Sequence, residues 1–193
     1  MSTPQEILTF WLEDVGPSGW YTADDPALDA KARDRFQADY RTAAEGGHTM
    51  WLTDSHSTLA YIVLTDQLPR NMYRGQAEAF ALDPSALAAS KLAIAKGWDK
   101  RTDEPGRQFF YLPLMHSENL CDQDRCVRLM ADRLPETGAE NLLHAKAHRE
   151  VIRRFGRFPF RNAALDRRST EAERAFLDGG GYGTVVRETR EAA

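Results

Sequence analysis

The chain has 193 residues, of which 42% are apolar and 10% aromatic, and its 25 Lys and Arg against 29 Asp and Glu give a net charge of -4. This composition is too apolar for a disordered chain, yet no run approaches the roughly 20 apolar residues of a membrane helix. No Lys or Arg precedes Lys31, whereas a secretory signal peptide begins with basic residues. The sequence therefore predicts a cytoplasmic protein without a membrane partner.

The basic residues are concentrated late in the chain. Residues 144–168 include eight basic residues against two acidic ones, whereas six acidic residues precede Lys31. Such a block is typical of a nucleic-acid surface, of an anion-binding pocket, or of the internal complement of an acidic region. Nucleic acid is the weakest of these interpretations, because the whole chain is acidic and no nucleic-acid-binding motif accompanies the block.

Helix-start signals recur along the chain, and no alternating strand pattern stands out. Thr3 can cap a helix that begins with Pro4, and Glu6 can bond back to the cap. Thr170 and Glu173 repeat this capping box, and acid-proline pairs open further helices at 25–26 and 83–84. We predict helices at 3–13, 26–45, 57–68, 84–96, 107–133, 139–155 and 170–178, with turns between them that include Pro69.

These elements predict an all-α fold. Short connections favour antiparallel neighbours, so we expect stacked helical hairpins in a single domain over residues 1–178. Residues 179–193, which begin with GGGYG and continue with charged residues, lack the Lys-Ser/Thr of a phosphate-binding loop. They are interpreted as a flexible C-terminal tail.

Polar residues occupy positions where the helical period requires apolar ones. LAYIVL at 59–64 is apolar on all sides, and Asp66 follows within the same predicted helix, so Asp66 should be buried. His116 and Gln123 fall on the apolar stripe of the 107–133 helix, and His148 lies in the centre of the apolar arc of 139–155. A buried carboxylate costs several kcal/mol unless it is paired, so Asp66 requires an arginine or histidine, which we expect from another helix.

Two interpretations of these polar residues stay open. They form either a structural network that ties three helices together or a functional pocket. In a pocket, Asp66 would orient a histidine or accept its proton, and His116 or His148 would act as general acid or base. Arginines would then hold an anionic substrate, and the candidates are Arg70, Arg149, Arg153 and Arg157.

Metal binding and cysteine chemistry are less favoured. His144 and His148 have the i, i+4 spacing of metal ligands, but HAKAH lacks the glutamate of zinc proteases and no third ligand follows from spacing. Cys121 and Cys126 lie five positions apart, which on a helix points them in different directions. The sequence therefore predicts no metal site and names no cofactor.

Four motifs in order resemble a known family: ILTFWLED, LTDQLPRNMYRG, FFYLPLMHSENLCDQ and AHREVIRRFGRFPFRNAAL. The chain resembles, from about Ile7 to Leu177, the bacterial family called domain of unknown function nine-two-four. The resemblance implies an all-helical, tetratricopeptide-like fold and no particular reaction. One departure is Phe160, where the family typically has histidine. The resemblance also implies a set of signature positions: Asp66, Gln67, Arg70, Asn71, His116, Ser117, Glu118, Gln123, His148, Arg149, Arg153, Arg157, Arg161 and Asn162.

Two functions follow as hypotheses. The first is a buried Asp/His/Arg pocket that binds or transforms a small anionic metabolite, with Gln67, Arg70 and Gln123 among the substrate-binding residues. The second is a tetratricopeptide-like module that binds a peptide or protein and in which the polar network is structural. Whether the protein is an enzyme is left open by the sequence.

Overall fold

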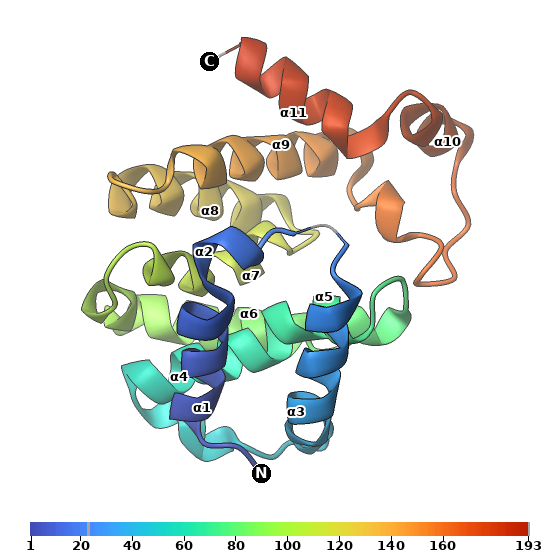
Figure 1. The fold of residues 1–193 in the computed structure, drawn as a ribbon. Coiled ribbons are helices and arrows are strands. Elements are labelled where there is room, and N and C mark those ends of the chain that lie inside the picture. Colours follow the sequence, from blue (N-terminus) through green and yellow to red (C-terminus); the bar gives the residue numbers. More distant parts are fainter. Residues whose placement is uncertain (23, 193) are drawn as a thin grey trace. The chain divides into compact units, whose positions relative to one another are not determined.

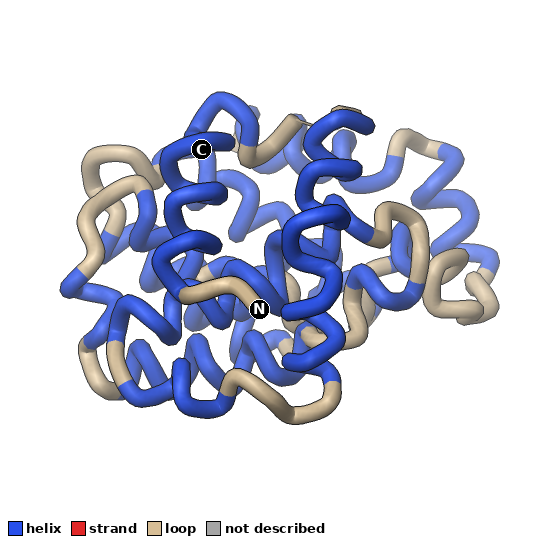
Figure 2. The backbone as a smooth tube through the Cα atoms, turned by 60° about the horizontal axis from the view of Figure 1, so that its bottom comes forward, coloured by secondary structure: helices blue, strands red, loops and turns tan. Residues whose placement is uncertain are grey.

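The computed structural model describes residues 1–22 and 24–192, and these residues are mostly helical, with no strand among them (Figure 2). They divide into two compact units, Met1–Pro113 and Leu114–Ala193. The all-α prediction is confirmed. Every helix in the described part of the chain is too short or too polar to cross a bilayer.

The first unit is built from α-helices with short π and 3-10 segments between them (Figure 1). In it α3 packs against α5, α1 against α4, and α4 against α6. Its core includes Phe10, which meets Phe36 at 5.0 Å between ring centroids, and Trp20, which meets Phe109 at 4.8 Å. The elements are α1 Pro4–Leu8, η1 Thr9–Val15, α2 Gly16–Gly19, α3 Pro26–Ala44, η2 Thr49–Thr53, α4 Ser55–Ile62, η3 Val63–Gln67, α5 Leu68–Met72, η4 Ala77–Ala79, α6 Asp83–Ala95, η5 Trp98–Arg101 and η6 Gly106–Phe110.

The second unit has α9 at its centre, with α8 and α11 both packed against it. Its core joins Val151 and Ile152 of α9 to Phe158 and Val185. The elements are α7 Leu112–Met115, which begins at the end of the first unit, α8 Leu120–Arg133, α9 Ala139–Phe155, η7 Pro159–Arg161, α10 Glu171–Asp178 and α11 Gly181–Glu191.

Local signals placed several helix ends correctly. The hydroxyl of Thr3 accepts from the backbone N–H of Glu6 at 3.3 Å, and the Glu6 carboxylate accepts from the N–H of Thr3 at 2.7 Å. Thr170 and Glu173 form the same capping box, with distances of 3.2 and 2.7 Å. The helix predicted at 139–155 is α9, which ends at Gly156 in a left-handed conformation with φ 69°. Helix ends set by neighbouring residues are thus readable from sequence.

The predicted turn at Pro69 is wrong. Residues 55–72 form one helical run through α4, η3 and α5, and Pro69 lies in the first turn of α5. The N–H of Leu68 bonds to the carbonyl of Val63, five residues back, so the run widens into a π turn before the proline. At the start of a new α-helix the missing N–H of proline costs little.

The helix predicted over 107–133 is also wrong. The chain there forms η6, α7 and α8, and residues 116–119 between α7 and α8 are not helical. The side chain of Asn119 caps α8 by accepting from the N–H of Cys121 at 2.9 Å, and Ser117 donates to Asp122 at 2.9 Å. These side-chain bonds compete with helix continuation, which is typical of Ser, Asn and Asp.

The prediction of a flexible tail fails for residues 181–191, which form α11. Val185 is 1% exposed in the core cluster, and Tyr182 and Val186 pack against that cluster. The apolar residues of α11 recur at 182, 185 and 186, a helical spacing that the glycine-rich start obscured. Burial of this face against α9 stabilises a helix that the glycines alone would disfavour.

Candidate functional site

Asp66 lies in the π segment η3 of the first unit, and its side chain is fully buried. The amide of Gln67 donates to the Asp66 carboxylate. Arg70, one turn later, donates to the backbone carbonyl of Asp66 and lies 3.4 Å from its carboxylate. Burial of Asp66 beside an arginine is confirmed. This arginine belongs to the same helical run as Asp66, and an arginine or histidine partner from another helix stays a prediction.

Arg70 links this buried carboxylate to α6. Its guanidinium lies 3.0 and 3.2 Å from the two carboxylate oxygens of Asp83, and its centre lies 5.8 Å from the Phe80 ring centroid. Burial disfavours the charged guanidinium, but the carboxylates of Asp66 and Asp83 outweigh that effect and raise the pKa of Arg70. Asp66, Gln67 and Arg70 therefore form one network that braces α5 against α6.

His116 and His148 lie together in the second unit, with ring centroids 6.3 Å apart. His148 projects from α9 as the period predicted. His116 follows α7 in the non-helical turn, so its predicted place on a helical stripe is wrong. The two imidazoles are thus brought together, although one of them is positioned by a turn rather than by a helix face.

Tyr182 of α11 completes this cluster, and sequence reasoning missed it because α11 was interpreted as a tail. Its hydroxyl oxygen lies 2.6 Å from Nδ1 of His144 and 2.9 Å from Nδ1 of His148. Its ring lies 4.7 Å from the His148 ring. The helical spacing of 182, 185 and 186 was the signal that could have found it.

The contacts of His148 fix its tautomer. Nδ1 of His148 lies 2.9 Å from the backbone carbonyl oxygen of His144, and a carbonyl oxygen only accepts hydrogen bonds. We therefore assign the proton of the neutral ring to Nδ1, which leaves a lone pair on Nε2. The hydroxyl of Tyr182 then donates to Nδ1 of His144 and accepts from His148. The single Nδ1–H of His148 is then shared between the carbonyl oxygen of His144 and the hydroxyl oxygen of Tyr182.

His148 is neutral near pH 7. Burial disfavours its imidazolium most, and the charges that His116 and Arg161 can carry disfavour it further, so its pKa is lowered from 6.5 to about 3. Burial also lowers the pKa of His144. A neutral imidazole with a lone pair on Nε2 can accept a proton or a hydrogen bond from a ligand.

Aromatic rings and an arginine border the histidines. The Phe158 ring lies 5.4 Å from that of His148, and the guanidinium of Arg161 lies 4.6 Å from the Phe158 centroid. Phe160 stacks on Phe158 at 5.2 Å and meets Tyr182 at 5.9 Å. Position 160, where the family resemblance implies histidine, therefore adjoins this cluster and is 42% exposed.

Like Arg70, the other three arginines predicted to bind substrate bond to protein acids. Arg149 lies 3.3 Å from Asp124, and Arg153 makes two 2.7 Å bonds to Glu150. Arg157 makes bonds of 2.6 and 2.8 Å to Glu173, the residue of the α10 capping box. Their side chains are bound at the surface of the helices, and their role as anion ligands stays a prediction.

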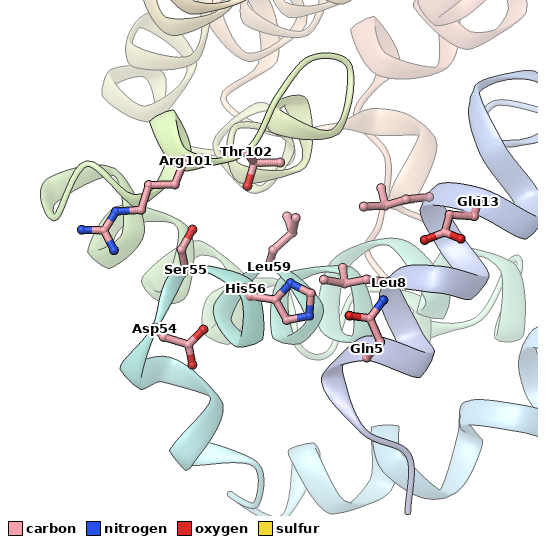
Figure 3. A pocket seen from close by; sticks show the side chains of 10 residues that line it. Gln5, Leu8, Glu13, Asp54, Ser55, His56, Leu59, Arg101 and Thr102 are labelled. Atoms are coloured by element: carbon pink, nitrogen blue, oxygen red, sulfur yellow. The ribbon is translucent and has the colours of Figure 1, made fainter.

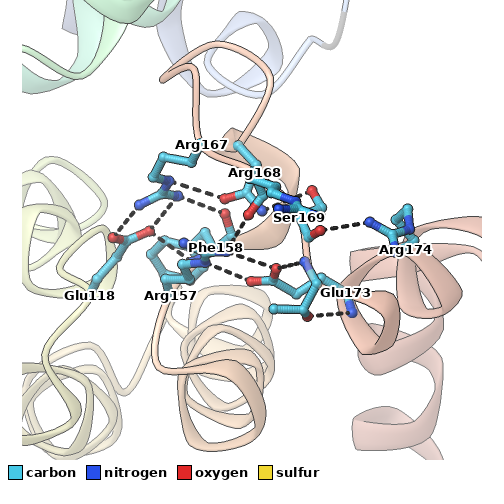
Figure 4. Close-up of polar contacts among 10 residues, drawn as sticks. Glu118, Arg157, Phe158, Arg167, Arg168, Ser169, Glu173 and Arg174 are labelled. Atoms are coloured by element: carbon cyan, nitrogen blue, oxygen red, sulfur yellow. Dashed lines mark hydrogen bonds and ion pairs between the residues drawn. The ribbon is translucent and has the colours of Figure 1, made fainter.

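Arg157 and Glu173 belong to a larger ionic network (Figure 4). Glu118 accepts from the two terminal guanidinium nitrogens of Arg167, at 2.7 and 3.0 Å, and from the N–H of Phe158 at 2.7 Å. Burial would raise the pKa of Glu118, but these bonds lower it. The network holds the segment between α9 and α10, from which Phe158 and Arg161 project.

Gln123 of α8 holds the turn that carries His116. Its amide nitrogen lies 2.6 Å from the carbonyl oxygen of Met115 and 2.7 Å from that of Ser117. Its buried oxygen accepts no hydrogen bond within residues 1–22 and 24–192. Gln123 thus positions His116 through the backbone, while its predicted contact with substrate stays a prediction.

The described residues contain no group of three or more His, Cys, Asp or Glu side chains that could hold a metal ion. Cys121 is exposed and Cys126 is buried, and both are free thiols. Burial raises the pKa of Cys126, which makes it a poor nucleophile.

Comparison with known proteins gives the family. The family described as "Bacterial protein of unknown function (DUF924)" matches residues 7–181. A solved structure, that of the protein of unknown function ATU0120 from Agrobacterium tumefaciens, shares 39% sequence identity at a TM-score of 0.83, over 91% of this chain and 97% of that one. No protein with curated annotation matches. Because the family match covers most of both units, the chain belongs to the bacterial DUF924 family.

Proposed function

We propose that the second unit binds a small anionic metabolite beside His116, His148, Tyr182 and Arg161, and that Nε2 of His148 accepts a proton or hydrogen bond from it. The observation that carries the proposal is the neutral imidazole of His148, oriented by the carbonyl oxygen of His144 and lying near the Arg161 guanidinium. A guanidinium such as that of Arg161 can bind an anion, and a neutral imidazole is the form that acts as a base. A cytoplasmic location is part of the same proposal.

The proposed site differs in two respects from the sequence prediction. Arg161, which is 6% exposed and stacks on Phe158, takes the role first given to Arg149, Arg153 and Arg157. Asp66 belongs to the first unit and the histidines to the second. A shared cavity for all three stays a prediction.

Calorimetry with inorganic phosphate and with malonate tests the proposal. We expect binding to the wild type and at least tenfold weaker binding to His148→Ala and Arg161→Ala variants whose helical content is unchanged. Arg153→Ala is the matched control, because Arg153 is exposed and bonded to Glu150. A loss with Arg153→Ala would instead support the original arginine prediction, and equal affinity in all four proteins would remove the proposal.

A second candidate is a module that binds peptides. The observation in its favour is a separate cavity within the first unit, and the ligand class of that cavity is inferred below.

A further inference from the structure

The first unit contains a cavity of about 510 Å³ (Figure 3). This volume falls in the range of roughly 300–1,000 Å³ that is typical of small-molecule sites. Three segments form it: α1 with η1, the start of α4, and the chain at the end of η5. The lining residues are Gln5, Leu8, Leu12, Glu13, Asp54, Ser55, His56, Leu59, Arg101 and Thr102.

The cavity has an apolar centre. Leu8 and Leu59 are 3% and 2% exposed, and Leu12 is half-buried beside them. In Figure 3, Leu8 and Leu59 lie between the charged groups of the rim. An apolar side chain of a ligand placed here would be removed from water, which contributes roughly 25 cal/mol per Å² of area buried.

Two opposite charges stand on opposite sides of this centre, Arg101 on one side and Glu13 on the other (Figure 3). Both residues are exposed, and neither forms an ion pair within the described part of the chain. Two other polar residues near the start of α4 form hydrogen bonds within the protein. Asp54 caps the helix by accepting from the N–H of Ser57 at 3.0 Å, and Ser55 donates to the carbonyl of Trp98 at 2.9 Å.

The unpaired charges and the apolar centre together define a ligand class. We propose that this cavity binds a short peptide with free ends, whose ammonium pairs with Glu13, whose carboxylate pairs with Arg101, and whose apolar side chains contact Leu8 and Leu59. A guanidinium can bind a carboxylate through two parallel hydrogen bonds, which favours Arg101 as the carboxylate partner. A zwitterion with an apolar middle matches the charges of Arg101 and Glu13 and the apolar centre of the cavity. A simple anion would leave Glu13 unpaired.

The backbone provides independent support. Leu12 and Glu13 belong to the π segment η1, and π turns are frequent at functional sites. This site shares no residue with the one proposed in the second unit, so the two can fail separately.

The test uses the full chain and the dipeptide Leu-Leu, with binding followed by calorimetry and by the imidazole NMR signal of His56. We expect Leu-Leu to bind and to shift the His56 signal. N-acetyl-Leu-Leu, which lacks the ammonium, and Leu-Leu amide, which lacks the carboxylate, should each bind about fivefold more weakly, as an exposed ion pair of up to about 1 kcal/mol predicts.

Matched variants assign the two charges. Arg101→Gln should weaken the binding of Leu-Leu by about fivefold and leave the binding of Leu-Leu amide unaffected. Glu13→Gln should also weaken the binding of Leu-Leu by about fivefold, and it should leave the binding of N-acetyl-Leu-Leu unaffected. Arg41→Gln and Glu45→Gln, exposed residues outside the cavity, should change nothing. Three results would each overturn the proposal: no binding of Leu-Leu, capped peptides that bind as tightly as Leu-Leu, or unchanged affinity for Leu-Leu in the Arg101 and Glu13 variants.

Discussion

The hydroxyl oxygen of Tyr182 lies 2.9 Å from Nδ1 of His148, and this contact joins α11 to α9 at the centre of the second unit. The same nitrogen faces the carbonyl oxygen of His144 at 2.9 Å. The orientation of the His148 ring thus depends on its own helix and on a residue 34 positions later. The last helix therefore contributes a side chain to the histidine cluster.

Removing the hydroxyl should cost stability. In Tyr182→Phe, Nδ1 of His144 loses its donor, and we expect the free energy of unfolding to fall by about 1 kcal/mol in urea denaturation. Tyr73→Phe is the control, because its hydroxyl receives only a 3.3 Å contact from Gln37 and should lose less. Equal losses in the two variants would contradict the hydrogen-bond assignment.

Acid should destabilise the fold through His148. Its pKa is lowered to about 3 from 6.5, so between these values the unfolded chain binds a proton that the folded chain does not. The contribution of His148 is thus fully present above pH 6.5 and is lost as the pH falls, by up to about 1.4 kcal/mol per pH unit. Denaturation between pH 6 and 5 should show a shallower slope for His148→Gln than for the wild type, whereas parallel slopes would show a histidine that titrates normally.

Asp66 should be the most sensitive carboxylate of the first unit. Asp66→Ala leaves Arg70 without its buried partner, and we expect a loss of roughly 3 kcal/mol in the free energy of unfolding. Asp132→Ala, on the exposed face of α8, should stay within about 0.5 kcal/mol of the wild type. A melting temperature unchanged by Asp66→Ala would refute the assigned network.

Helix α11 should be protected from solvent exchange. Val185 is 1% exposed and its backbone carbonyl accepts from the Thr189 hydroxyl at 2.7 Å, so the helix is held by its buried face. Hydrogen exchange at the amides of residues 185–191 should be slowed well beyond that of an unstructured peptide, and Val185→Asp should restore fast exchange. Fast exchange in the wild type would show that this segment is the flexible tail predicted from the sequence.

The sequence by itself determined where many helices begin. Thr3 with Glu6, and Thr170 with Glu173, act on backbone groups within three positions, so their effect is readable without knowledge of the fold. The apolar run before Asp66 likewise indicated burial, because a helix that is apolar on all sides has no face for water.

Only the tertiary structure decided which polar groups meet. The period of α9 placed His148 on an apolar arc but could not name Tyr182 as its partner, because a helical face specifies what must be covered and not what covers it. The partner of Arg153 could not be named from the sequence either. The sequence allowed it to bind an anionic ligand or Glu150, and in the structure it pairs with Glu150. Glycines hid α11 for a related reason: its stability comes from packing Val185 against α9, a contact between distant positions that local propensity does not contain.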